Sequence, residues 1–84
     1  MTIIPNYVWV SESADTLHLL SVADNTIVAY IHIHDYLFEV EYKVSYDKWE
    51  QILFNKEATI PRLKHYVERK LDIPHSEVGT YKER

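Results

Sequence analysis

The alternation of apolar and polar residues between positions 27 and 44 constrains the fold more than any other feature of the sequence. Successive side chains of a β-strand point to opposite faces, so the pattern predicts two strands, 27–34 and 37–44, with Asp35 and Tyr36 at the bend. In the expected register one face is apolar, with the pairs Ile33 and Phe38, Ile31 and Val40, Ala29 and Tyr42, and Ile27 and Val44. A shift by one residue would mix the two faces, and the pattern therefore selects this register.

The other face of this hairpin is polar and aromatic. It is expected to carry Val28, Tyr30, His32 and His34 on one strand and Leu37, Glu39, Glu41 and Lys43 on the other. Two earlier segments, 7–10 and 17–22, are also expected to be strands, because they are rich in β-branched, aromatic and other apolar residues. The second of these is apolar at both parities, so either Leu17 or Leu19 is expected on the polar face too.

The second half of the sequence predicts two helices. Ser45 can cap the first helix, which is expected to end at Asn55. Its apolar residues, which fall on one helical stripe, are Tyr46, Trp49, Ile52 and Leu53. Pro61 is expected in the first turn of the second helix, where a missing amide is tolerated, and Ile73-Pro74 ends that helix. Residues 75–84 are polar and are expected to form a loose tail.

These elements predict an α+β fold of the order ββββαα. A four-stranded antiparallel β-meander is followed by two α-helices packed on one sheet face. The chain has 84 residues, which is enough for a single globular domain, expected over residues 1–74 and followed by the tail 75–84. Helices on one face leave the other sheet face open, and a binding site would most economically lie there.

Composition excludes several classes of function. The chain has one glycine, Gly79, whereas loops that hold phosphate groups need several. It has no cysteine, which excludes zinc fingers, iron–sulfur clusters, thiol catalysis and disulfides. No motif supplies a nucleophile, a base and oxyanion donors together, so we expect neither an enzyme nor a cofactor. We find neither a signal peptide nor an apolar run of about 18 residues, and a cytoplasmic protein without a membrane segment is expected.

The polar face of the hairpin contains residue types that could bind a metal ion. His32 and His34 project to one face of a strand with Glu39 on the neighbouring strand, and imidazole and carboxylate groups are ligands for zinc, nickel or copper. We favour ordinary cross-strand polar pairs at these positions, such as His32 with Glu39. The motif His65-x-x-Glu68 lacks the second histidine of zinc-protease motifs and is interpreted as helix surface.

Basic residues of the last helix could bind nucleic acid. The candidates, which share one stretch of that helix, are Arg62, Lys64, His65 and Arg69. Glu68 and Asp72 interrupt this basic stripe, and the whole chain has a net charge of −4, which repels phosphates. An ordinary solvated helix face is therefore the favoured interpretation.

The open sheet face is expected to bind another protein. The residues expected to line it are Tyr30, His32, His34, Leu37, Glu39 and Glu41. Residues 1–45 hold six acidic residues and one lysine, so a partner with a basic surface is favoured, and charge would speed their encounter. The same face could instead close a symmetric homodimer.

A short segment adds a resemblance. Residues 59–68 read Thr59-Ile60-Pro61-Arg62-Leu63-Lys64-His65-Tyr66-Val67-Glu68. This is similar to the Ser/Thr-Leu-x-x-Ala-Lys-x-x-Val-Glu helix that closes many small phage proteins built from a sheet and a helix, with Leu63 in place of alanine. The resemblance implies an accessory protein of a phage or similar element, and we expect a non-enzymatic inhibitor or adaptor.

Overall fold

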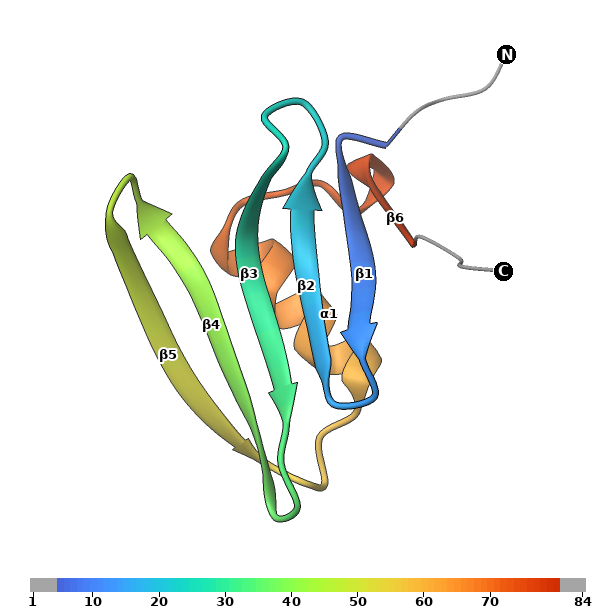
Figure 1. The fold of residues 1–84 in the computed structure, drawn as a ribbon, viewed down its shortest axis with the longest axis vertical. Helices are drawn as coiled ribbons and strands as arrows, with labels where there is room; N and C mark the ends of the chain where they lie inside the picture. Colours follow the sequence, from blue (N-terminus) through green and yellow to red (C-terminus); the bar gives the residue numbers. More distant parts are fainter. Residues whose placement is uncertain (1–4, 81–84) are drawn as a thin grey trace.

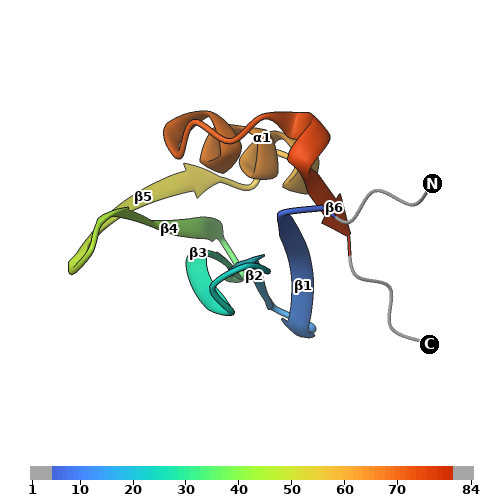
Figure 2. The same cartoon turned by 90° about the horizontal axis from the view of Figure 1, so that it is seen from above.

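The computed structural model describes residues 5–80, which form a six-stranded sheet with one α-helix on one of its faces (Figures 1 and 2). The elements, in chain order, are β1 (Tyr7–Ser13), β2 (Thr16–Ser21), β3 (Thr26–Ile33), β4 (Leu37–Ser45), β5 (Lys48–Asn55), α1 (Ile60–Lys70), the 3₁₀ turn η1 (His75–Glu77) and β6 (Val78–Thr80). The strand order is β5-β4-β3-β2-β1-β6. The first five strands form an antiparallel meander, and β6 pairs in parallel with β1.

The predicted register of the β3–β4 hairpin is confirmed. Ile33 pairs with Phe38, Ile31 with Val40, and Ala29 with Tyr42. The ladder does not extend to a pair between Ile27 and Val44, because the β2–β3 register shifts: Leu19 pairs with Ala29, but Leu20 pairs with Ile27. Val28 is therefore the extra residue of a bulge, which reorients its side chain. It packs against the buried core, and its expected place on the open face is wrong.

The helix predicted between Ser45 and Asn55 is wrong, because these residues form the end of β4, a turn and β5. Residues 49–54 are apolar at both helical and strand spacing, so periodicity alone is ambiguous. Pairing decides between them: Ile52 lies opposite Val40 and Phe54 opposite Phe38, and both pairs extend the apolar face of the hairpin.

The tail predicted for residues 75–84 is replaced, as far as residue 80, by η1 and β6. Val78 pairs with Tyr7 and packs against the core. A side chain at Gly79 would place its Cβ 2.8 Å from Cγ of Pro5, so the close approach of β6 to the start of β1 requires glycine. Residues 81–84 lie outside the described residues.

The core lies between α1 and the sheet. Its buried apolar residues are Trp9, Leu19, Ala29, Ile31, Phe38, Val40, Tyr42, Leu63, Val67 and Ile73. Thr59 caps α1, and its hydroxyl accepts a hydrogen bond from the amide of Arg62. Leu17 and Leu19 both contribute to this side of the sheet, so neither lies on the open face.

The helix ends in a left-handed turn that reverses the chain. Asp72 has a φ of 56°, the conformation that usually follows a helix C-terminus. Its amide donates to the carbonyl of Arg69, and the amide of Ile73 donates to the carbonyl of Glu68 at 2.8 Å. These two bonds satisfy the last helical carbonyls and direct residues 73–80 back along the helix toward β1.

Replacement of Leu63 by alanine should lower the free energy of unfolding by about 2–5 kcal/mol, because this side chain is 1% exposed and its loss leaves a cavity under α1. Leu53→Ala is the matched control, since that leucine is 58% exposed on the other face and should cost less than about 1 kcal/mol. Urea unfolding of both variants measures the difference. Equal costs would contradict the placement of the core.

Candidate functional site

The sheet face opposite α1 is uncovered in the described part of the chain, and we call it the open face (Figure 2). Backbone register aligns its residues in rows across the strands. One row contains Val10, His18, Tyr30, Glu41 and Gln51, and the next contains Thr16, His32, Glu39 and Leu53. Side chains in adjacent positions of such rows contact one another, so the open face is continuous from β1 to β5.

Tyr30 lies at the centre of an aromatic cluster on this face. Its ring is stacked on that of His32, with centroids 5.5 Å apart and planes at 13°. His18 meets it edge-on at 6.3 Å, and Trp49 lies 5.8 Å away. Aromatic pairs at these separations attract each other beyond the effect of buried area alone. Contacts on three sides therefore hold the Tyr30 ring in a defined orientation.

Three histidine–glutamate pairs surround this cluster. Nε2 of His32 lies 2.8 Å from Oε1 of Glu41, and Nε2 of His34 lies 3.0 Å from Oε1 of Glu39. The backbone pairs His32 with Glu39, but the side chains bond diagonally, so the expected His32–Glu39 side-chain pair is not the one formed. The hydrogen bond from His34 lowers the pKa of Glu39, and partial burial of the carboxylate opposes this effect.

The third pair is incomplete. Nδ1 of His18 lies 3.2 Å from Oε1 of Glu12, yet the geometry does not make a hydrogen bond. This nitrogen is buried and has no hydrogen-bond partner among the described residues. A buried donor or acceptor without a partner is costly, so the site has an unsatisfied polar group close to Tyr30.

The structure places most of the predicted binding residues together. Tyr30, His32, His34, Glu39 and Glu41 form the contacts described above, whereas Leu37 lies at the far end of β4, opposite Asn55. The sequence interpretation missed Trp49 and His18. The predicted helical stripe includes Trp49, and residues 17–22 are apolar at both parities, so the sequence does not orient His18. The apolar pairs Leu19–Ala29 and Ile52–Val40 are the signal that would have oriented both strands.

The metal candidate on this face is only partly formed. Donor atoms of His32, Glu39 and Glu41 lie within 4.8 Å of one another, and His34 does not belong to this set. Each member already has a partner, because His32 bonds Glu41 and Glu39 bonds His34. The three residues and His34 thus form two histidine–glutamate pairs side by side on the open face.

The basic residues of α1 are divided between two sides of the helix. An open groove of about 880 Å³ runs beside the helix, and its lining residues are Phe54, Ala58, Arg62, Leu63, His65, Tyr66, Arg69 and Lys70. Lys64 is not among them, because its ammonium group lies 5.8 Å from the ring centroid of Trp9. Three of the four nucleic-acid candidates therefore share one groove, and the fourth does not.

Comparison with protein-family models, with curated proteins and with solved structures finds no match. Within residues 5–80, α1 is too short and too polar to cross a membrane. Function is therefore inferred from the contacts and charges of the described residues.

The bond between Glu39 and His34 should make stability depend on acid pH. Because the folded pKa of Glu39 is below its ordinary value of 4.5, its contribution is present above that pH and is lost as the pH falls through the folded pKa. Glu39→Gln should cost about 0.5 kcal/mol at pH 6 and less at pH 3, measured by urea unfolding. Glu57→Gln, in the exposed loop before α1, controls for loss of charge. A cost that is equal at both pH values would contradict this assignment.

Proposed function

We propose that the protein is a non-enzymatic module that binds a basic surface of another protein through the open face. The observation that carries the proposal is the aromatic cluster of Tyr30, Trp49, His18 and His32 at the centre of an uncovered, acidic sheet face. Tyrosine and tryptophan dominate the energetics of protein interfaces when they are surrounded by polar groups that exclude water. The open face has both the aromatic residues and, around them, the polar histidine–glutamate pairs.

The charge of the face favours a basic partner. Glu12, Glu39 and Glu41 lie on it, and Lys43 is the lysine that the sheet register places beside them. Carboxylates on a rim raise the rate of encounter with a positive surface and repel an acidic one. The histidine partners hold Glu39 and Glu41 in place, so little side-chain freedom remains to be lost on binding.

The finer assignment is an inhibitor or adaptor that belongs to a phage or similar element and acts in the cytoplasm. The helix segment Thr59–Glu68, which resembles the closing helix of small phage proteins, supports this assignment. An acidic surface that competes for a basic one is one physical route to inhibition, because it can occupy a site that normally holds nucleic acid.

A photo-crosslinking amino acid at Leu53, which is exposed on the open face, tests the proposal in cells of the native host. We expect a crosslinked product with a basic protein from this position and none from the same group at Arg69, on the helix side. Tyr30→Ala should weaken the complex by about 2 kcal/mol or more, and Glu39→Lys with Glu41→Lys should slow association at low salt.

Two results would overturn this proposal. One is a product of twice the chain mass, which would identify the open face as a homodimer interface. The other is crosslinking that survives both sets of substitutions in variants whose circular dichroism matches that of the unaltered protein. Tyr30→Phe, which keeps the ring, should retain the partner and controls for loss of packing.

Binding of nucleic acid is the second candidate, and the groove beside α1 supports it because Arg62, Arg69 and Lys70 line it. The net charge of −4 opposes it, and we expect no complex with duplex DNA near physiological salt in a gel-shift assay. A salt-sensitive complex that is lost in Arg62→Ala and Arg69→Ala would instead favour this candidate.

A further inference from the structure

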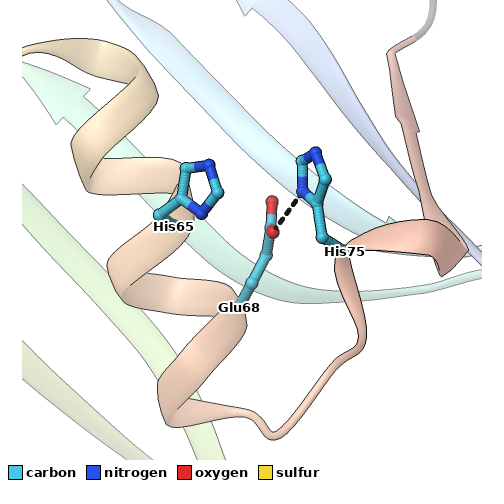
Figure 3. Close-up of side chains that lie close together, drawn as sticks. All are labelled: His65, Glu68 and His75. Atoms are coloured by element: carbon cyan, nitrogen blue, oxygen red, sulfur yellow. Dashed lines mark hydrogen bonds and ion pairs between the residues drawn. The ribbon is translucent and has the colours of Figure 1, made fainter.

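Three side chains with metal-ligating atoms meet between α1 and η1. His65 and Glu68 are three positions apart on the helix and share one of its sides, and His75 faces them from the start of η1 (Figure 3). Donor atoms of the three residues lie within 4.8 Å of one another. The left-handed turn at Asp72 makes this possible, because it reverses the chain and returns His75 to the helix.

Glu68 is a buried carboxylate, only 4% exposed. Its Oε2 accepts a hydrogen bond from the indole nitrogen of Trp9 at 3.2 Å, and its Oε1 lies 2.9 Å from Nδ1 of His75. Among residues 5–80, no lysine or arginine nitrogen lies within 4.0 Å of this carboxylate. A buried carboxylate is costly unless it is paired with a positive charge, and here only a histidine is available.

The two imidazoles are placed to share a cation. The rings of His65 and His75 are stacked, with centroids 5.0 Å apart and planes at 18°. Both residues are exposed, and the side chain of His75 is 72% exposed, so an ion can reach them from solvent. Two protonated rings at this separation would repel each other, whereas each neutral ring has one nitrogen lone pair, in the plane of the ring, that can coordinate an ion.

We propose that His65, Glu68 and His75 bind one divalent transition-metal ion, zinc by its chemistry, with water completing the coordination. Two imidazole nitrogens and one carboxylate oxygen suit zinc, whereas calcium and magnesium prefer oxygen ligands alone. The ion supplies the positive charge that Glu68 lacks. Trp9 holds the second carboxylate oxygen and acts as a positioning residue, since such outer partners orient the ligands of a metal.

This site differs from the His32, Glu39 and Glu41 cluster of the open face in one decisive respect. Glu39 and Glu41 are each bonded to a histidine, as Glu68 is, but their side chains are partly accessible to water, with exposures of 22% and 34%. Glu68 has little access to water. The buried carboxylate gains more from a cation, so the metal should prefer the site on α1.

Calorimetric titration of the intact chain with zinc chloride tests the proposal. We expect one ion per chain with a micromolar dissociation constant. His65→Ala and His75→Ala each remove a ligand rather than an outer partner, so each should weaken binding by more than about 100-fold. Both substitutions remove an exposed imidazole, so folding should be retained. His32→Ala is the matched control and should leave the affinity unchanged. Binding should also weaken at acidic pH, because protonated imidazole cannot coordinate.

A second readout uses cobalt(II), whose visible absorption reports nitrogen and oxygen ligands. The spectrum should appear with the unaltered chain and with His32→Ala and be absent with His75→Ala. Loss of binding in His32→Ala alone, or no binding below millimolar zinc, would overturn the proposal. So would a doubling of the sedimenting mass on zinc addition, because the ion would then bridge two chains. Glu68→Gln tests the carboxylate; if that variant does not fold, the two histidine variants decide.

Discussion

The packing of Leu63 and Val67 against the apolar rows of β2, β3 and β4 is the interaction on which the other features depend. Because these residues attach α1 to one sheet face, the opposite face stays open and the aromatic cluster around Tyr30 remains accessible. The same attachment places Glu68 beside Trp9 at the level of the sheet, where the carboxylate is buried. Both candidate sites therefore follow from a single helix–sheet contact.

Polar groups at the edges of this core are satisfied by specific partners. The hydroxyl of Tyr42 donates to Oε2 of Glu50 at 2.8 Å, and this bond together with burial raises the pKa of the tyrosine. The indole nitrogen of Trp9 likewise donates a hydrogen bond to Oε2 of Glu68. Carboxylates thus accept hydrogen bonds from buried aromatic side chains at two separate places around the core.

Local pattern predicted the central hairpin well, because the parity of residues 27–44 admits one register. It failed for β5, where apolar residues such as Trp49 and Leu53 lie on the solvent side and imitate a helical stripe. Local pattern also failed for β6. This strand has three residues, Val78–Thr80, which are too few to show a period, and it forms because it pairs with β1 at the other end of the sequence. Most of the predicted binding residues belong to the central hairpin, and the structure accordingly places Tyr30, His32, His34, Glu39 and Glu41 together.

In both candidate sites, local sequence pattern misses a residue that a contact distant in the sequence brings to the site. Parity placed Tyr30 and Glu41 on one face, but their neighbour Trp49 required the β4–β5 register. The partner that His65 and Glu68 lack within the helix is supplied by His75, after a left-handed turn at Asp72. Glycine is the usual residue at such a helix end and none stands there, so helical spacing alone could not indicate that the histidine returns to the helix.

The edge strand β6 has a consequence for local unfolding. Asn6 and Glu77, which are hydrogen-bonded beside it, are 71 positions apart in the sequence, whereas the other strands pair with sequence neighbours. Because β6 has three residues and pairs with β1 alone among the described strands, it has few contacts to lose, and we expect it and η1 to open more readily than the meander. Detachment of this one edge would separate His75 from His65 and expose the Glu68 carboxylate to water. Any ion held by these three residues would therefore link η1 to α1 and oppose the detachment of β6.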